Sequence, residues 1–371
     1  MPLYLTDDQA MLRDTARDFM AEQGAIRSQL RHWRDIGCKD GFGHGLWKQF
    51  AEMGFAGILI GEEEGGLGLG HVEAGIVLEE IGRNLTPSPF LTTAVAFVAA
   101  VKGTAHGARW FPGILAGETV AALAIDEGAR HRPEAIAMRA ERAGNGFRLD
   151  GAKQFVVQGA SADVTLVAAR TDEGLTLFAV EKDAKGLEVE GVRLADASIG
   201  ARLTFDGVEV DADAVVGEVG GGDTMLARSL AAGRTGAAAE LVGLASAALD
   251  MTVDYLKQRQ QFGKPIGEFQ ALQFRSAHLY SELEIARAAT LKAQQLLDEG
   301  SDAAEAMVSV AKAKASRASQ LAVQEGVQMH GGIGMTDEHD IGLYMKRDRV
   351  LAELFGDANY HADRLARLKG Y

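Results

Sequence analysis

Apolar residues recur at every third or fourth position through the first part of the chain. This period is typical of amphipathic helices, and it predicts helices over residues 7–22, 46–53 and 72–81. Glycine-rich breaks separate these segments from one another. The pattern therefore predicts a helical N-terminal domain over residues 1–118.

From about Val120 the period changes to two, with β-branched and aromatic residues alternating with polar ones. Turn sequences such as Asp150-Gly151 and Asp206-Gly207 separate the runs. We therefore expect a small antiparallel β domain over residues 119–216. Its predicted strands include residues 147–149, 154–157, 164–168, 175–180 and 203–210.

Beyond a glycine run at residues 217–222, which is typical of a linker, the helical period returns. Long helices are predicted over residues 225–258, 268–297 and 302–329, and shorter ones begin near Asp337 and Ala358. Residues 223–371 should form a C-terminal four-helix bundle. The fold class is therefore α+β, with a helical domain, a central β domain and a helical bundle.

Charge and composition narrow the range of functions. The 371 residues include 38 Lys and Arg against 52 Asp and Glu, a formal net charge of −14. An acidic chain is poorly suited to contacts with nucleic-acid phosphates, so we expect no nucleic-acid partner. The single cysteine, Cys38, forms no internal disulfide and no thiolate metal cage, which fits a reducing compartment.

The N-terminal residues do not form a basic segment followed by an apolar one, which is the pattern of a signal peptide. No apolar stretch approaches the roughly 20 uncharged residues that a membrane span needs, so we expect no membrane partner and a cytoplasmic location. The acidic neighbours of His339 point in different directions if that segment is helical, and they make a poor metal site. No metal is expected.

Two segments contain residues suited to binding an anionic ligand. Around Gln328 a long helix should end at Gly331 and Gly332, and this leaves backbone N–H groups available to a phosphate, with Thr336 able to cap the next helix. Arg259 begins a cationic turn between two bundle helices. Each segment read by itself is also consistent with an ordinary helix end or a solvated surface turn.

These segments, together with others along nearly the whole chain, resemble the acyl-CoA dehydrogenase family. Because several motifs occur in the family's order and at the family's spacing, chance is a poor explanation. The resemblance implies the family's fold, which agrees with the three regions described above. The matching motifs are residues 5–9, 64–68, 78–83, 151–156, 205–210, 259–266, 269–270, 328–332 and 347–348.

The resemblance implies bound FAD and α,β-dehydrogenation of an acyl-CoA thioester, with electrons passing to an electron-transfer flavoprotein. It also implies at least a dimer, because one FAD site needs two chains; a homodimer, a homotetramer or a heterotetramer with a related chain all satisfy this. A guanidinium suits a pyrophosphate, and glycines allow close backbone approach. By position, the FAD-binding residues are Arg259, Phe262 and Gln270 from one subunit, and Gln328, Gly331 and Gly332 from its neighbour.

The flavin end departs from the family's pattern. The family's Thr-Glu segment followed by Gly-Ser-Asp is replaced here by residues 125–131, which lack that serine. Where the family has Trp-x-Thr, Phe155 and Val157 stand here. Phe155 retains the apolar packing against the flavin, and backbone N–H groups would have to replace the missing hydroxyl.

The general base is also not where the family usually has it. Most members place a Glu before Gly-Thr near the C-terminus, and Gly356 aligns with that Glu. Another branch places the Glu just before an Arg early in the first bundle helix, where Gly233 precedes Arg234. Arg234 is expected near the flavin end, where it would help to set the charge; its alternative role is a structural ion pair.

Two carboxylates near these positions are candidates for the base. Asp357 is one residue beyond the usual site, and its alternative role is to cap the helix that begins near Ala358. Glu240 lies two helical turns after Gly233, on the same helix face, and its alternative role is an ion pair across the bundle. The catalytic candidates are therefore Asp357, Glu240 and Arg234.

The sequence accordingly predicts an FAD-dependent acyl-CoA dehydrogenase from a branch that often accepts bulky, branched or cyclic acyl chains. Two alternatives remain open. One is a flavin oxidase or monooxygenase on the same scaffold. The other is a non-catalytic structural subunit of a heteromeric acyl-CoA dehydrogenase, suggested by the absent base and hydroxyl.

Overall fold

The computed structural model describes residues 3–371, which form two compact units. One unit contains the chain up to Ile26, His71–Thr86 and Arg234–Tyr371, and the other contains Arg27–Gly70 and Pro87–Gly233. We call them the bundle unit and the sheet unit. The helices of the expected N-terminal domain are divided between the two, and the domain limits drawn from the sequence stay a prediction.

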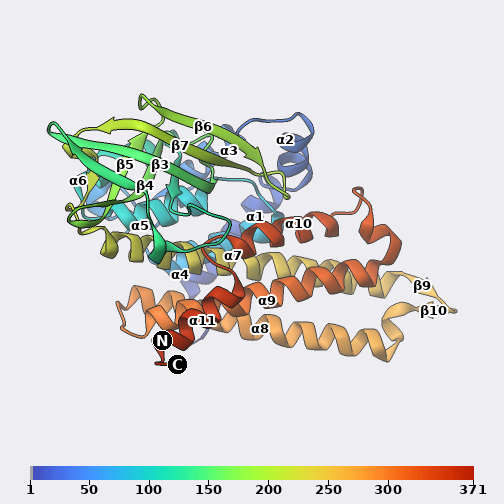
Figure 1. The fold of residues 1–371 in the computed structure, drawn as a ribbon. Coiled ribbons are helices and arrows are strands. Elements are labelled where there is room, and N and C mark those ends of the chain that lie inside the picture. The colour runs from blue at the N-terminus through green and yellow to red at the C-terminus, as the bar shows by residue number, and fades with distance from the viewer. Residues whose placement is uncertain (1–2) are drawn as a thin grey trace. The chain divides into compact units, whose positions relative to one another are not determined.

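An eight-stranded sheet forms the centre of the sheet unit (Figure 1). Its strands run in the order β6-β7-β3-β2-β4-β5-β8, and β1 pairs with β4. Most neighbours are antiparallel, as predicted, but β1 and β2 both run parallel to β4. The strands are β1 (Ala121–Ala124), β2 (Arg139–Ala143), β3 (Gly146–Val157), β4 (Val164–Thr171), β5 (Gly174–Glu181), β6 (Leu187–Arg193), β7 (Ile199–Val210) and β8 (Val215–Val216).

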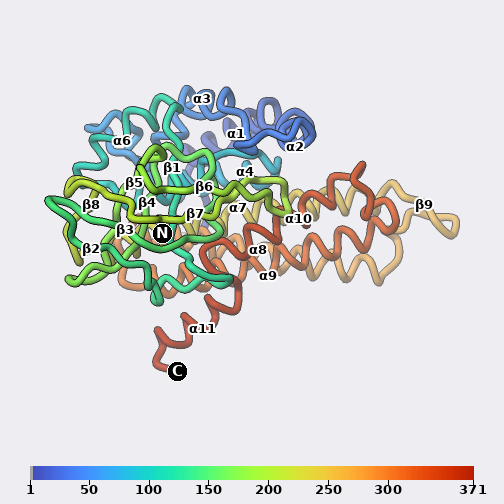
Figure 2. The backbone as a smooth tube through the Cα atoms, turned by 45° about the horizontal axis from the view of Figure 1, so that its top comes forward, coloured from blue at the N-terminus to red at the C-terminus, as the bar shows by residue number. Residues whose placement is uncertain are grey.

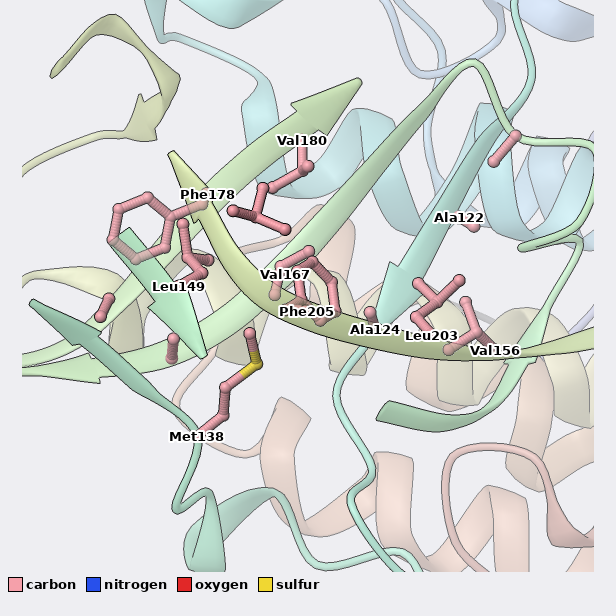
Figure 3. Close-up of a cluster of buried hydrophobic side chains, with 14 of the residues drawn as sticks. Ala122, Ala124, Met138, Leu149, Val156, Val167, Phe178, Val180, Leu203 and Phe205 are labelled. Carbon is pink, nitrogen blue, oxygen red and sulfur yellow. The ribbon is translucent and has the colours of Figure 1, made fainter. Parts of the chain in front are cut away.

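The core of this sheet consists of inward-facing side chains from neighbouring strands (Figure 3). Val167 on β4 is in register with Phe178 on β5, and Leu149 on β3 is in register with Val208 on β7. Burying each such side chain stabilises the fold by about 1.5–3 kcal/mol relative to leaving it exposed. The alternating residues that predicted the strands therefore build this core.

Short helices complete the sheet unit. Thr93 joins one of them to the sheet: its hydroxyl donates to Ala121 O of β1 at 3.1 Å and accepts from Ala121 N at 2.9 Å. Trp47 and Phe50 are fully buried and lie with ring centroids 6.1 Å apart. These helices are η1 (Arg27–Arg31), α2 (His32–Asp35), α3 (His44–Glu52), η2 (Phe55–Gly57), η3 (Glu62–Glu64), η4 (Leu91–Phe97), α5 (Val98–Val101), α6 (Ala105–Leu115), η5 (Pro133–Ala135) and η6 (Ala212–Ala214).

The bundle unit is helical, as the sequence predicts. Its helices α8 and α9 lie side by side, and α11 packs on α9 (Figure 1). A short hairpin projects beyond the helix ends (Figure 2). The elements are α1 (Asp7–Glu22), α4 (His71–Asn84), α7 (Gly222–Gln258, from Arg234 onward), β9 (Gln260–Gln261), β10 (Lys264–Pro265), η7 (Ile266–Glu268), α8 (Gln270–Asp298), α9 (Ala304–His330), η8 (Gly331–Met335), α10 (Ile341–Glu353) and α11 (Ala358–Leu368).

Two glycines let α4 and α7 approach each other at backbone distance. A Cβ atom on Gly243 would lie 1.8 Å from Glu79 O, and one on Gly82 would lie 2.1 Å from Glu240 O. No other residue fits at either position without moving a helix. This close contact fixes the part of α7 that carries Arg234 and Glu240 against α4.

Helix α7 is long and apolar enough to cross a membrane by length and composition alone. Within its most apolar window, however, 83% of the residues are buried inside the fold. Core helices of soluble proteins pass the same test, so this helix is weak support for a membrane location.

Candidate functional site

The loop that follows β1 forms the first part of the candidate site, in the sheet unit. Asp126 O accepts a hydrogen bond from Gln154 N of β3 at 2.8 Å, so the loop lies along that strand. The Asp126 carboxylate is 3.0 Å from His131 Nδ1 and also accepts from Arg132 N at 3.2 Å. These bonds close residues 126–132 into a compact turn.

A buried ion pair anchors the same loop. The ammonium group of Lys153, which is fully buried, donates to Ile125 O at 3.1 Å and to Glu127 Oε1 at 2.8 Å. Burial lowers the pKa of Lys153, although Glu127 opposes the shift. Burial by itself would raise the pKa of Glu127, but hydrogen bonds from Lys153 and from the backbone N–H groups of Met138 and Ala137 lower it below its usual value.

Phe155 stands at a bulge of β3 next to this loop. The register between β3 and β7 shifts between Lys153 and Val156, and Phe155 has a φ of +52°. A non-glycine residue in this region carries about 1–3 kcal/mol of strain, and such strain concentrates at ligand sites. The bulge leaves the Phe155 ring half-buried, while Val157 is buried.

A cavity of about 510 Å³ opens on the loop. Arg130 and Arg132 line it, together with Gly128 and Ala129. Both arginines are exposed, so they are available to an anionic ligand. The remaining lining residues are Ile125, Glu127, Ala135 and Ile136.

In the bundle unit, the predicted phosphate-binding residues lie on exposed helix ends. Arg259 follows the last residue of α7, and Gln270 begins α8 after the β9–β10 hairpin. Phe262, at the tip of that hairpin, is 91% exposed and has a φ of +55°. The hairpin therefore presents an arginine and an aromatic ring outside the fold of its own chain.

Gly331 and Gly332, at the end of α9, form what is here called the glycine loop, and no other described part of the chain covers it. Gly331 has a φ of +64°, and a Cβ atom on Gly331 or Gly332 would meet nothing within 4 Å. Gln328 is exposed one turn before them. Thr336 does not cap the next helix, contrary to expectation: its hydroxyl donates to Ile333 O instead, and α10 begins only at Ile341.

The histidine that precedes these glycines is buried, and the sequence analysis did not single it out. His330 stacks between Tyr255 of α7, at 4.5 Å between ring centroids, and His339, at 4.4 Å. Its Nδ1 atom lies 2.7 Å from Gly326 O. Because Arg259 is one turn beyond Tyr255, this stack places Arg259 and the glycine loop at the same end of the bundle.

The segment between α10 and α11, residues 354–357, is here called the base loop. Carbonyl groups in and next to this loop accept hydrogen bonds from two basic side chains, those of Lys312 and Arg234. Lys312 Nζ donates to Ala352 O at 2.9 Å and to Gly356 O at 3.0 Å. Phe355 O accepts from Arg234 Nε at 3.2 Å and lies 3.1 Å from His361 Nε2.

Arg234 also contacts the first helix turn beyond the base loop. Its Nη2 atom donates to the Tyr360 hydroxyl at 3.2 Å, and its guanidinium carbon lies 5.5 Å from the centre of the Tyr360 ring. Arg234 is only 3% exposed. The structure therefore brings Arg234 together with the base loop, and its expected place near the flavin end stays a prediction.

The two predicted bases both have structural partners. Asp357 is the N-cap of α11, and its Oδ1 atom accepts from Tyr360 N at 2.7 Å. Glu240 is buried and accepts from Arg347 Nε of α10 at 2.8 Å. The alternative roles given for these residues are thus present, and their assignment as bases stays a prediction.

Burial and the positive charge of Arg234 shift several pKa values around the base loop. Burial, with the charge of Arg234, lowers the pKa of Lys312 to about 7. Burial, with the charges of Arg234 and Lys312, lowers the pKa of His361 to about 2, so its ring is neutral. Burial raises the pKa of Asp348 to about 6, against the hydrogen bond from Ser319.

Comparisons with known proteins identify the family. The models of the acyl-CoA dehydrogenase N-terminal, middle and C-terminal domains match residues 6–118, 122–208 and 220–369. The chain belongs to the acyl-CoA dehydrogenase family, whose members are oxidoreductases that act on CH–CH bonds and bind FAD. The resemblance, the fold class and the cofactor expected from the sequence are therefore confirmed.

Similar proteins cover almost the whole chain. Mitochondrial isovaleryl-CoA dehydrogenase of Solanum tuberosum is 32% identical over 369 residues, 95% of this chain and 88% of its own length. Cyclohex-1-ene-1-carbonyl-CoA dehydrogenase of Geobacter metallireducens is 32% identical over 376 residues, 96% of each chain. A solved structure of a steroid ACAD variant is 30% identical, with a TM-score of 0.89 over 98% of each chain.

The residues present fit FAD. The strained bulge at Phe155 holds a half-buried aromatic ring on the strand that bonds to the loop, and the loop opens on a cavity lined by two arginines. An aromatic ring and guanidinium groups suit a planar ring system joined to phosphates. The exposed Arg259 and the open backbone at Gly331 and Gly332 suit the pyrophosphate and the nucleotide half.

Sequence reasoning missed the groups that surround the base loop: the buried Lys312 and His361 and the half-buried Tyr360. All three lie in helical segments with no motif, and no local pattern sets them apart. The sequence around Lys312 does carry a weak signal. A lysine among alanines on an apolar helix face needs hydrogen-bond partners when it is buried. The partners of Lys312 come from α10 and the base loop, which lie some forty residues further along the chain.

Proposed function

We propose that the chain catalyses FAD-dependent α,β-dehydrogenation of an acyl-CoA thioester with a bulky or cyclic acyl group. The observation that carries this proposal is the turn of residues 126–132, locked by Lys153 and Glu127 against the strained bulge at Phe155. Relatives named for cyclohexene-carbonyl and steroid substrates support the acyl class.

The chemistry requires a proton acceptor, donors for the thioester carbonyl and a site that excludes water. FAD, when bound, supplies the two-electron oxidant. Phe155, with its half-buried ring, would pack against the flavin, and backbone N–H groups of the turn would replace the hydroxyl that the family usually provides there. The base loop, held by Lys312 and Arg234, would bring the proton acceptor to the substrate.

Exposed apolar side chains support an assembly of at least two chains. Phe262, Phe274 and Met335 are all more than two-thirds exposed, and they lie in the hairpin after Arg259, in the first turns of α8 and in η8 with the glycine loop. Apolar side chains gathered in this way are typical of a contact surface. A second subunit would cover them and complete one FAD site with Arg259, and reduced cofactor would pass its electrons to an electron-transfer flavoprotein.

A second candidate is a non-catalytic subunit that supports the FAD site of a partner chain. The observation that favours it is the engagement of both candidate carboxylates: Asp357 caps α11, and Glu240 is paired with Arg347. A carboxylate fixed in a cap or a buried ion pair is less available to take a proton.

An absorbance scan followed by anaerobic titration distinguishes the two candidates. Purified protein should show a flavin spectrum, and a branched, cyclic or steroid-like acyl-CoA should bleach it in the absence of oxygen. Bound flavin that no acyl-CoA bleaches would favour the supporting subunit. Rapid reoxidation of the bleached flavin by air, with no electron-transfer protein present, would favour an oxidase instead.

A further inference from the structure

The buried side chain of His330 lies between the elements that support the glycine loop, and it is 3% exposed. Its ring centroid lies 4.5 Å from that of Tyr255 on α7 and 4.4 Å from that of His339. The backbone of η8 also folds back on this residue, since a Cβ atom on Gly334 would lie 3.0 Å from His330 Cβ. His330 therefore joins α7 to the turn that carries the glycine loop and to the segment before α10.

The hydrogen bonds of the His330 ring define its neutral form. Nδ1 lies 2.7 Å from Gly326 O, and a carbonyl oxygen only accepts hydrogen bonds, so Nδ1 carries the proton. Nε2 is then left as an acceptor, and it is buried with no hydrogen-bond partner among the described residues. A proton added to Nε2 would place a charge in this buried position without an acceptor, which is unfavourable. The stack therefore suits the neutral imidazole and not the imidazolium.

The groups around the ring do not offset this penalty. Burial lowers the pKa of His330, the bond to Gly326 O opposes the shift, and the charge of a protonated His339 lowers the pKa further. The titratable groups that face the ring are Tyr255, from α7, and His339, from the segment before α10. Residues 326–336, which include η8, have no other titratable side chain. None of these groups is a carboxylate, so none stabilises an imidazolium in the stack.

We infer that His330 is a positioning residue for FAD: its neutral ring holds the glycine loop against α7, and protonation of the ring releases the loop. Gly331 and Gly332 follow it directly, so movement of the ring moves the backbone N–H groups that suit the nucleotide half of the cofactor. Mild acid should therefore weaken the retention of FAD. This inference rests on the placement of FAD in the proposed function and is independent of the acyl-CoA.

The state of the loop is tested first, by a readout that does not depend on turnover. Backbone hydrogen exchange of residues 331–335 in the holoprotein is measured by mass spectrometry at pH 7 and pH 5, with correction for the intrinsic effect of pH on exchange. In wild type, protection should fall at least about threefold at pH 5, because protonation depletes the closed state. His330→Phe retains an aromatic ring that cannot be protonated, and it should show equal protection at both pH values.

Flavin release from the holoprotein is followed in parallel, by the fluorescence of free FAD after dilution. Release from wild type should be at least about threefold faster at pH 5 than at pH 7, and the two rates for His330→Phe should differ by less than about twofold. His339→Phe should keep the pH dependence and shift it to higher pH, because the charge of His339 lowers the pKa of His330. His32→Phe, which replaces an exposed histidine of the sheet unit, is the matched control and should behave as wild type.

The possible outcomes separate this inference from the proposed function. Equal protection of residues 331–335 at pH 7 and pH 5 in wild type overturns the inference, and this measurement needs no variant to fold. A pH dependence that persists in His330→Phe, or that disappears in His339→Phe, also overturns it; in each case the proposed function stands. If the purified protein holds no flavin, the proposed function fails, and hydrogen exchange still decides whether protonation of His330 releases the loop.

Discussion

Gly356→Ala is the substitution for which the structure predicts the largest and most specific effect in the base loop. Gly356 has a φ of +104°, a backbone conformation that residues with a side chain rarely adopt. A Cβ atom there would lie 2.4 Å and 3.0 Å from two atoms of the Tyr360 ring, and 3.1 Å from His361 Nε2. The new methyl group therefore meets both an unfavourable backbone conformation and an occupied space.

The magnitude follows from these two contributions. A non-glycine residue in such a conformation costs about 1–3 kcal/mol. Overpacking against a ring that cannot move freely costs about 1–3 kcal/mol more. Tyr360 is restrained by Arg234 and by its backbone bond to Asp357, so we expect a loss of about 4 kcal/mol in the free energy of unfolding.

Urea unfolding, followed by circular dichroism, measures this loss. Gly300→Ala is the matched control, because Gly300 has a φ of +61° and a Cβ atom there would meet nothing within 4 Å, so it carries only the backbone contribution. The double variant Gly356→Ala with Tyr360→Ala removes the overlap. The coupling between the two substitutions should be at least about 1 kcal/mol in the direction of rescue.

Two results would refute this reasoning. One is a loss of unfolding free energy in Gly356→Ala that is no larger than in Gly300→Ala. This would mean that the Tyr360 ring moves aside without destabilising the fold. The other is a double variant whose loss equals the sum of the single losses, which would mean that Tyr360 does not fill the space. If the prediction holds, a glutamate placed at residue 356 will not restore a base there, because its side chain has nowhere to go.

Three further predictions concern the cofactor and the buried charges. Arg259→Ala should weaken FAD retention by about 1.5–3 kcal/mol, measured as flavin released on gel filtration, while Lys257→Ala on the same helix end should retain it. Burial lowers the pKa of His361 to about 2, so below pH 6.5 the unfolded chain binds a proton at this histidine that the folded chain does not. The contribution of His361 to the free energy of unfolding should therefore fall by about 1.4 kcal/mol per pH unit from pH 6.5 toward pH 2, measured as the difference between wild type and His361→Gln in urea unfolding at each pH. Glu240→Gln leaves the Arg347 charge without its carboxylate and should cost about 2–4 kcal/mol in urea unfolding.

Local patterns predicted the regular elements well where the signals were strong. The helix predicted at residues 7–22 has those bounds in the structure, because Thr6 and Gln9 form a capping box that fixes its start. Strands β4, β5 and β7 followed from their alternation and β-branched residues. Strand β6 was missed because it is exposed along nearly its whole length and shows no alternation of buried and exposed residues.

The sequence by itself determined the fold class, the family and the FAD cofactor, because those depend on local periodicity and on short motifs within single segments of the chain. It also showed that the usual base is missing at Gly356 and before Arg234. The tertiary structure alone decided the partners of the side chains near that position: Asp357 caps a helix, Glu240 forms an ion pair with Arg347, and the Tyr360 hydroxyl accepts from Arg234. Those outcomes depend on which helices pack together, since a buried charge takes whatever partner the packing brings within reach.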